Sequence, residues 1–315
     1  MIPGWWGLWA VLAAASGSGA TPAGDAAAPT AWNACPDRAP GARSSGRFLL
    51  ARYGHGVAVV EAAVSDEARL ARLWSRATPG GTAIDWPGGR PGVRHLTDPK
   101  DFSAAVAKAK GGRLYFWTAA DGWNGGEAER ISSVELAKSL CDARDLVVYL
   151  VAPVPTPGSG FAVASLDAPP EEAAAPASAD ASREVVNRIY ASLTAQLETG
   201  IQAQKYAPSS LAINLFSGRF SEAASQYAVS LRWGNALDDR FSLLYLADAK
   251  GNLAHLVDRQ EGGAGGVLVG AGDVDGDGYS ELIYEVTTLD GSSVALWSLR
   301  GGTPRTIVQT TPVGQ

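Results

Sequence analysis

Residues 272–284 read Gly-Asp-Val-Asp-Gly-Asp-Gly-Tyr-Ser-Glu-Leu-Ile-Tyr, and they carry the most specific pattern of the 315-residue chain. Carboxylates alternate at Asp273, Asp275 and Asp277, and the glycines between and after them let the backbone curl because they have no Cβ atom. In a curled backbone these carboxylates converge, which favours a hard cation with oxygen ligands. The stretch therefore predicts a calcium loop.

The residues that follow the loop decide between a helical and a strand setting. An EF-hand with the same beginning needs a bidentate Glu at the last position of its loop, and counting from Asp273 that position is Tyr284. Residues 282–287 favour a strand, and residues 289–292 supply a turn into a second apolar segment at 294–297. The loop is therefore predicted between two β-strands.

The loop resembles the calcium loops of the FG-GAP/VCBS repeats, which occur in the blades of integrin-like β-propellers. The family pattern is Asp-x-Asp/Asn-x-Asp-Gly-x-x-Asp followed by an apolar strand, and here Glu stands at the last acidic position. One copy covers about one blade, Phe241 to Val308, so a full propeller is not expected. The resemblance implies these metal ligands: Asp273, Asp275, Asp277, Glu281 and the Tyr279 carbonyl. The alternative is an Asp/Gly hairpin that binds no metal.

The composition describes a folded chain with an acidic balance. With 46% hydrophobic and 18% charged residues, 315 residues can bury a substantial core and form two domains. The net charge of -6, without a basic stripe, argues against nucleic acid as a partner. No later stretch reaches about 18 consecutive apolar residues, so no membrane span is expected in the mature chain.

The N-terminus indicates export. Residues 5–15 form a short apolar run and residues 18–20 offer small side chains at a cleavage site, which predicts a signal peptide over 1–20. We therefore expect a periplasmic or secreted protein, such as a bacterial envelope protein. Cys35 and Cys141 are the only cysteines, and in an exported chain they most simply form a disulfide, the alternative being two buried thiols.

The order of the expected elements predicts an α+β fold with a small N-terminal α/β domain. A lead-in rich in Ala, Pro and Gly covers residues 21–46, and the α/β domain covers 47–152. That domain is expected to begin with a hairpin and to alternate helices and strands. The expected elements are a hairpin over 48–60, helices near 68–74, 101–110 and 128–143, and strands at 113–117 and 146–151.

The second half is predicted to be a mainly antiparallel β domain that one amphipathic helix precedes. A Pro/Ala-rich linker covers residues 153–181, and the β domain covers 182–315 with the calcium loop at 273–281. Ser182 can cap the helix, whose apolar residues recur at three- and four-residue intervals. Short strands at regular spacing then predict a sandwich, a simple antiparallel sheet or an incomplete propeller-like unit.

Catalytic motifs are sparse in this sequence. His55, His95 and His255 are the ordinary candidates for proton transfer near neutral pH, and the best cluster is His95 with Asp85 and Asp98. An isolated histidine with no catalytic role is the competing interpretation. Aromatic residues offer a second possibility, because exposed rings can grip a glycan, whereas buried rings only pack the core. These residues are Tyr115, Phe116, Trp117 and Trp123.

The sequence favours a non-enzymatic binding or envelope-structural protein with one structural Ca²⁺ ion and an unidentified protein or glycan ligand. The alternative is an exported hydrolase with its active site in the N-terminal domain and the β domain as an accessory module. A pocket that joins His95 to Asp85 or Asp98 would favour the hydrolase, and dispersed histidines would favour binding.

Overall fold

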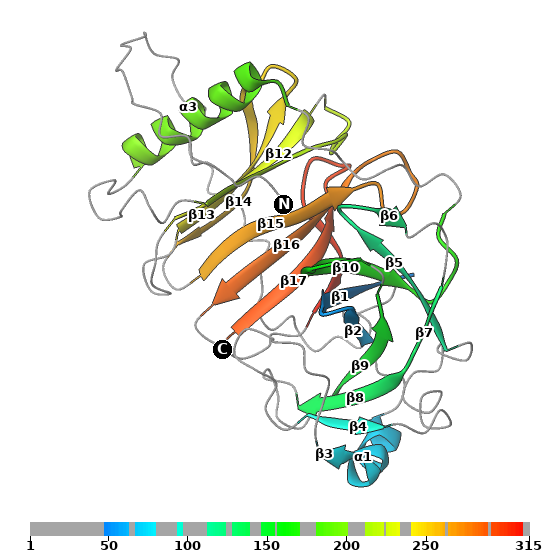
Figure 1. The fold of residues 1–315 in the computed structure, drawn as a ribbon. Coiled ribbons are helices and arrows are strands. Elements are labelled where there is room, and N and C mark those ends of the chain that lie inside the picture. The colour runs from blue at the N-terminus through cyan, green and yellow to red at the C-terminus, as the bar shows by residue number, and fades with distance from the viewer. Residues whose placement is uncertain are drawn as a thin grey trace, which may run out of the picture.

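The computed structural model describes residues 47–62, 67–79, 93–96, 112–123, 128–138, 146–154, 156–170, 181–200, 212–223, 225–233, 241–261, 264–288 and 291–310. Strands make up 61% of the structure and helices 11%. The predicted α+β class is therefore wrong. The part of the chain that the structure describes forms three antiparallel sheets with two helices, and no N-terminal α/β domain is evident in it (Figure 1).

The first sheet has ten strands, and every pairing in it is antiparallel. Its spatial order differs from the order along the chain because strands from distant segments pair. In spatial order the strands are β3 (Thr78–Pro79), β4 (Arg94–Leu96), β8 (Ser133–Lys138), β9 (Leu146–Pro153), β2 (Val57–Ala62), β1 (Phe48–Gly54), β10 (Ser159–Ser165), β5 (Arg113–Thr118) and β6 (Gly122–Trp123), with β7 (Glu129–Arg130) paired to β5.

The first hairpin forms where the sequence predicts it. His55 and Gly56 connect β1 to β2, and their φ values of 53° and 75° are both positive. A two-residue turn with positive φ at both positions matches the right-handed twist of the strands. Helix α1 (Glu67–Arg76) follows, as predicted, and Leu73 enters the core beneath the sheet.

Two predicted segments differ from the structure in a way that explains the wrong fold class. Residues 128–143 were expected to form a helix but contain β7 and β8. Glu, Leu, Ala and Lys in β8 favour helices, yet Leu136 and Ala137 enter cores on opposite faces of the sheet, so tertiary pairing overrides propensity. The predicted linker at 153–181 contains β10, whose Val163 and Ala164 are also buried on opposite faces. The predicted helix near 101–110 lies outside the described residues.

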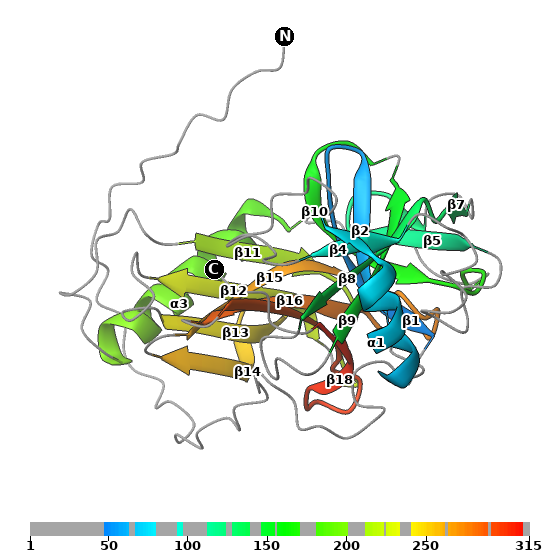
Figure 2. The ribbon, with the colours of Figure 1, turned by 90° about the horizontal axis from the view of Figure 1, so that it is seen from below.

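The second half contains helix α3 (Arg183–Gly200) and two four-stranded meanders, in which consecutive strands pair. Ser182 caps α3, since its Oγ accepts a hydrogen bond from Val185 N at 3.3 Å. The helix covers the outer face of the first meander (Figures 1 and 2). The strands are β11 (Ala212–Ser217), β12 (Ser225–Trp233), β13 (Phe241–Asp248) and β14 (Leu253–Glu261), then β15 (Ala264–Gly272), β16 (Glu281–Thr288), β17 (Gly291–Ser298) and β18 (Arg305–Gln309).

The β15–β18 sheet is the middle layer of the molecule. Leu282 and Tyr284 of β16 pack in a core shared with the first meander, whereas Ile283 packs in a core shared with the N-terminal sheet. Adjacent residues of a strand point to opposite faces, so this sheet is buried on both sides. An ion pair of 2.8 Å between Arg52 in β1 and Glu285 in β16 connects the N-terminal sheet to the β15–β18 sheet.

The edge strand β15 runs against side chains of the first meander. Gly266 N donates to Ser242 Oγ (2.7 Å), Leu268 N donates to Ser230 Oγ (2.9 Å), and Asn214 Nδ2 donates to Leu268 O (2.8 Å). These polar groups satisfy backbone atoms that a neighbouring strand would otherwise have to satisfy. The loop at the end of β15 is thus attached to a firmly held strand.

Candidate metal centre

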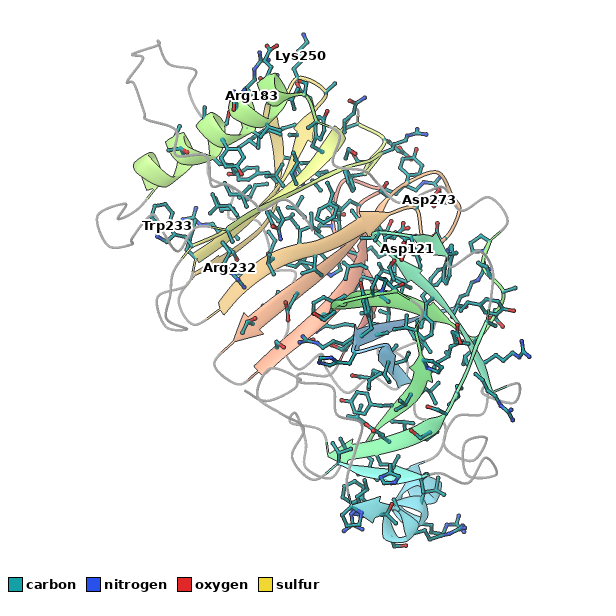
Figure 3. The ribbon with its side chains drawn as sticks, viewed as in Figure 1. Asp121, Arg183, Arg232, Trp233, Lys250 and Asp273 are labelled. Carbon is teal, nitrogen blue, oxygen red and sulfur yellow. The ribbon has the colours of Figure 1, made fainter. Side chains whose placement is uncertain are left out.

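The β15–β16 loop is folded by its own first carboxylate. Asp273 Oδ1 accepts a hydrogen bond from Gly276 N (2.8 Å), and Asp273 Oδ2 accepts one from Gly278 N (3.0 Å). Both glycines have positive φ, 80° and 83°, which residues with a Cβ atom rarely adopt. Figure 3 places Asp273 at the end of β15, beside the turn between β5 and β6. The predicted curl of the loop is therefore present.

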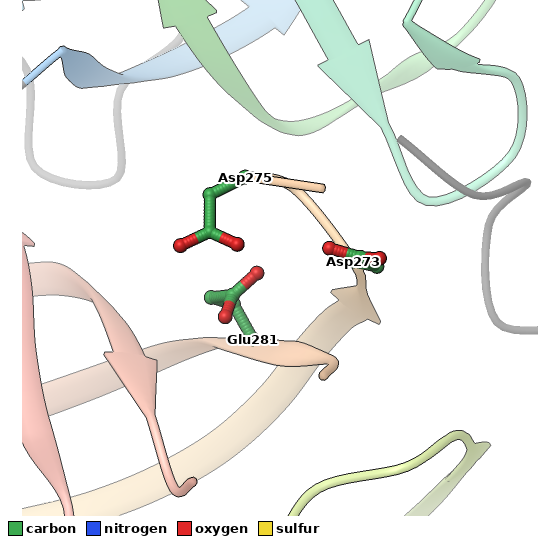
Figure 4. Close-up of side chains that lie close together, drawn as sticks. All are labelled: Asp273, Asp275 and Glu281. Carbon is green, nitrogen blue, oxygen red and sulfur yellow. The ribbon is translucent and has the colours of Figure 1, made fainter. Parts of the chain in front are cut away.

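Three of the predicted ligands meet in this curl (Figure 4). One oxygen each from Asp273, Asp275 and Glu281 can be chosen so that all three lie within 4.8 Å of one another. The pairing of β15 with β16 brings them together, since Gly272 lies opposite Glu281 at the mouth of the hairpin. The cluster joins both ends of the loop.

Glu281 is the most constrained member of this cluster. Its side chain is 1% exposed, and Oε2 accepts a hydrogen bond from Val274 N at 2.9 Å. Oε1 is buried and has no hydrogen-bond partner among the described residues. No described lysine or arginine forms an ion pair with Glu281, Asp273 or Asp275. The buried Glu281 carboxylate therefore lies beside two other carboxylates, and no described lysine or arginine compensates its charge.

The electrostatics of the loop favour protons or a cation. Burial raises the pKa of Glu281 from 4.5 to about 8, and the nearby Asp275 carboxylate adds to the rise. Burial also raises the pKa of Asp275, and the charge of Asp277 reinforces the effect. Two unit charges 4.8 Å apart repel by about 3.5 kcal/mol at an effective dielectric constant of about 20. A bound cation would reverse the sign of these interactions.

The other two predicted ligands make different contacts in this structure. Asp277 lies at the surface, where its Oδ2 accepts a hydrogen bond from Arg300 Nη1 at 3.1 Å. The Tyr279 ring is buried, and the guanidinium carbons of Arg219 and Arg300 lie 4.3 Å and 4.9 Å from its centroid. Arg219 Nη2 also donates to the Tyr279 hydroxyl at 3.0 Å. The side chains of Asp277 and Tyr279 thus secure the outer part of the loop, and the charge of Asp277 still raises the pKa values of Asp275 and Glu281.

Sequence reasoning missed the contacts that the loop makes with the N-terminal sheet. Trp123 Nε1 donates a hydrogen bond to Val274 O at 3.2 Å, and Val274 is fully buried in the core between the two sheets. The two residues are 151 positions apart. The only hint in the sequence is that Val274, between two aspartates, is apolar rather than polar.

The catalytic candidates do not form a cluster in the described structure. His55 lies in the β1–β2 turn, His95 in β4 and His255 in the edge strand β14. His95 Nε2 lies 3.2 Å from Thr78 Oγ1, and its cross-strand neighbour is the buried Glu135. The predicted partners of His95, which are Asp85 and Asp98, lie outside the described residues, as do Cys35 and Cys141.

The aromatic candidates are mostly core residues. Phe116 is 1% exposed and Trp117 is 0% exposed, on opposite faces of β5. Trp123 is partly buried, and its ring centroid lies 6.1 Å from that of Phe48. Phe116 and Trp117 therefore pack the core and are closed to a glycan.

Comparison of the chain with protein-family models, with curated proteins and with solved structures gave no match. Within the described residues, neither helix combines the length and the apolar character that crossing a bilayer requires.

Proposed function

We propose that the β15–β16 loop binds one Ca²⁺ ion through Asp273, Asp275 and Glu281. The observation that carries this proposal is the buried Glu281 Oε1, which has no hydrogen-bond partner in the described part of the chain. A buried charged oxygen without a partner is costly. The Glu281 carboxylate that carries this oxygen nevertheless lies in a group with the carboxylates of Asp273 and Asp275, and a cation can neutralise such a group.

The donor set supports Ca²⁺ over other metals. Carboxylate oxygens without nitrogen or sulfur donors favour hard cations. A Ca²⁺ ion about 2.4 Å from each ligand can contact oxygens that lie within 4.8 Å of one another. Ca²⁺ accepts six to eight oxygens in irregular arrangements, whereas Mg²⁺ requires a near-ideal octahedron and keeps several waters. The Tyr279 carbonyl, the Asp277 carboxylate and water are the expected additional ligands.

The place of the loop in the fold supports the resemblance to FG-GAP/VCBS repeats. The loop joins the first two strands of a four-stranded antiparallel meander, and propeller blades are sheets of this kind. A second meander, β11–β14, directly precedes it and shares a core with it. We infer an incomplete propeller-like unit in which one sheet carries the calcium loop.

The proposed role of the ion is structural, in an exported, non-enzymatic protein that binds a protein or glycan or supports the cell envelope. The ion would neutralise repelling carboxylates and join the two ends of a loop that lies between sheets. The scattered histidines support binding over hydrolysis. The apolar run at 5–15 and the small residues at 18–20 support export.

Thermal unfolding of the full chain in Ca²⁺, in Mg²⁺ and in chelator tests the site. An ion bound only by the native state should raise stability by about 2.7 kcal/mol when its concentration is 100 times the Kd. Asp275→Asn should abolish most of this rise. Glu184→Gln, the same loss of charge on exposed α3, should leave it intact. Equal melting of the parent in millimolar Ca²⁺ and in chelator would refute the site.

A further inference from the structure

Val274 connects the carboxylate cluster to the N-terminal sheet. Its backbone N–H donates to Glu281 Oε2 (2.9 Å), and its carbonyl accepts from Trp123 Nε1 (3.2 Å). Its side chain is 0% exposed and packs with Phe48 and neighbouring residues of the N-terminal sheet. Val274, which lies between the proposed ligands Asp273 and Asp275, thus contacts Glu281 through its N–H group and the N-terminal sheet through its carbonyl and side chain.

A second tryptophan of the N-terminal sheet contacts the residue before the first ligand. A Cβ atom on Gly272 would lie 2.4 Å from Trp117 Cζ2, so the indole packs directly against the Gly272 backbone. Trp117 and Trp123 are cross-strand partners in β5 and β6. The two indoles therefore hold the backbone on both sides of Asp273, at Gly272 and at Val274.

These contacts are confined to one part of the loop. Residues 272–274 are buried, whereas Asp277 and Gly278 are exposed. The buried part carries the Asp273 carboxylate and the N–H group that orients Glu281. The N-terminal sheet therefore contacts the part of the loop that carries the Asp273 carboxylate and the N–H group bonded to Glu281.

We propose that Trp123 and Trp117 are positioning residues of the cation site, so that cation binding and docking of the N-terminal sheet stabilise each other. This inference rests on the calcium site proposed above, and it adds that docking of the N-terminal sheet regulates the cation affinity of that site. A cation that fixes Asp273, Asp275 and Glu281 also fixes the Val274 carbonyl in reach of Trp123. Coupling of this kind is reciprocal, so loss of the Trp123 bond must weaken cation binding by the factor by which the cation strengthens that bond.

Calorimetric titration of the full chain with Ca²⁺ tests the coupling. Trp123→Phe keeps a ring against Phe48 but removes the N–H donor to Val274, and it should weaken Ca²⁺ binding about 3- to 10-fold. The matched control is Trp297→Phe, since Trp297 is fully buried on the opposite face of the β15–β18 sheet. Its N–H has no hydrogen-bond partner among the described residues. The control should lower stability without changing the Ca²⁺ affinity.

Hydrogen exchange of the parent chain gives a readout that needs no variant. Ca²⁺ should slow exchange of the amides in residues 113–123, although none of these residues is a proposed ligand. The coupling would be overturned if the parent binds Ca²⁺ without a change of exchange in residues 113–123 and Trp123→Phe binds Ca²⁺ with an affinity within 2-fold of the parent. The calcium site itself would still stand. Absence of Ca²⁺ binding by the parent would overturn the calcium site itself. If Trp123→Phe does not fold, the exchange experiment decides alone.

Discussion

The β13–β14 turn and the β15–β16 loop are both built from Asp and Gly, but the carboxylate pKa values shift in opposite directions. The pKa of Asp248 in the turn is lowered, whereas the pKa values of Asp275 and Glu281 in the loop are raised. Asp248, the last residue of β13, accepts hydrogen bonds from Lys250 N, Asn252 N and Asn252 Nδ2 at 2.8–2.9 Å. Gly251 supplies a positive φ of 82°, as Gly276 does in the second loop. The side-chain hydrogen bond from Asn252 Nδ2 contributes most to lowering the pKa of Asp248, and the bonds from the backbone N–H groups lower it further.

The difference between the two turns comes from the carboxylates added to the second one. Asp273 plays the part of Asp248, because it accepts two backbone N–H groups and folds its loop. Asp275 and Glu281 then add two more carboxylates beside it, and burial raises the pKa of both. An acidic glycine turn satisfies one exposed carboxylate by itself. A group of three, of which Asp273 and Glu281 are buried and Asp275 is half-buried, needs an additional positive charge.

The largest expected effect is on the pH dependence of stability in chelator. The folded-state pKa of Glu281, about 8, lies above its ordinary value of 4.5, so its contribution is present at low pH and is lost as the pH rises through 8. Stability should therefore fall between pH 5 and 8, by up to about 1.4 kcal/mol per pH unit. Asp248 acts in the opposite direction, because its lowered pKa contributes stability that is lost on acidification.

Denaturant unfolding across this pH range, with and without Ca²⁺, measures the slope. Asp258 and Asp275 also have pKa values raised by burial, so the parent slope contains their contributions. Glu281→Gln should remove most of the dependence of unfolding free energy on pH in chelator. In the parent, Ca²⁺ should remove this dependence. A parent whose stability in chelator does not change from pH 5 to 8 would contradict the electrostatic description of the loop.

The second expected effect is loss of Ca²⁺-dependent stabilisation in Glu281→Gln. The amide oxygen of Gln can still accept from Val274 N, so the loop can keep its fold while it loses one charge. The gain of about 2.7 kcal/mol expected at 100 times the Kd should largely disappear. Asp248→Asn should keep the full Ca²⁺-dependent gain in stability and should lose only part of the hydrogen bonding of Asp248 in the β13–β14 turn. Equal gains in both variants would show that the two acidic turns do not differ in metal binding.

The loop could be predicted because its chemistry is local. The proposed ligands lie within residues 273–281, and strand-forming residues follow directly, so spacing alone excludes an EF-hand. The two C-terminal meanders are equally local, since each strand pairs with its neighbour in the chain. The hairpin at β1 and β2 was predicted for the same reason. Short-range patterns therefore predict the two C-terminal meanders and the first hairpin.

Much of the N-terminal sheet depends on pairings between distant segments, which no local pattern contains. Phe48 pairs with Ser165, and β10 then lies between β1 and β5, which places a segment that contains Gly and Ser in the interior of the sheet. Strands buried on both faces also lose the simple alternation that separates strands from helices. The contact of Trp123 with Val274 is hidden for the same reason, because it exists only after the sheets dock.

A third prediction compares the glycines of the two turns. Gly251 has a positive φ, and a Cβ atom there would also lie 2.8 Å from the Val185 carbonyl oxygen, so Gly251→Ala should cost about 2 kcal/mol. At Gly278 nothing lies within 4 Å of such an atom, so Gly278→Ala meets only the backbone strain of about 1 kcal/mol. Only Gly278→Ala should also weaken Ca²⁺ binding in calorimetry. A weaker affinity in Gly251→Ala would mean that the two turns are coupled.

The smallest expected effect concerns Asp277, which the sequence pattern makes a ligand and the structure pairs with Arg300 at 3.1 Å. The Arg300 side chain is 54% exposed, and an exposed pair of this kind contributes at most about 1 kcal/mol. If Asp277 turns to the ion, Arg300→Met should strengthen Ca²⁺ binding about 2- to 5-fold, because no ion pair has to be broken and one nearby positive charge is lost. An unchanged Kd would mean that Asp277 stays with the surface of the loop. The site would then depend on Asp273, Asp275 and Glu281, and the contrast with the Asp248 turn would come from these three carboxylates without a contribution from Asp277.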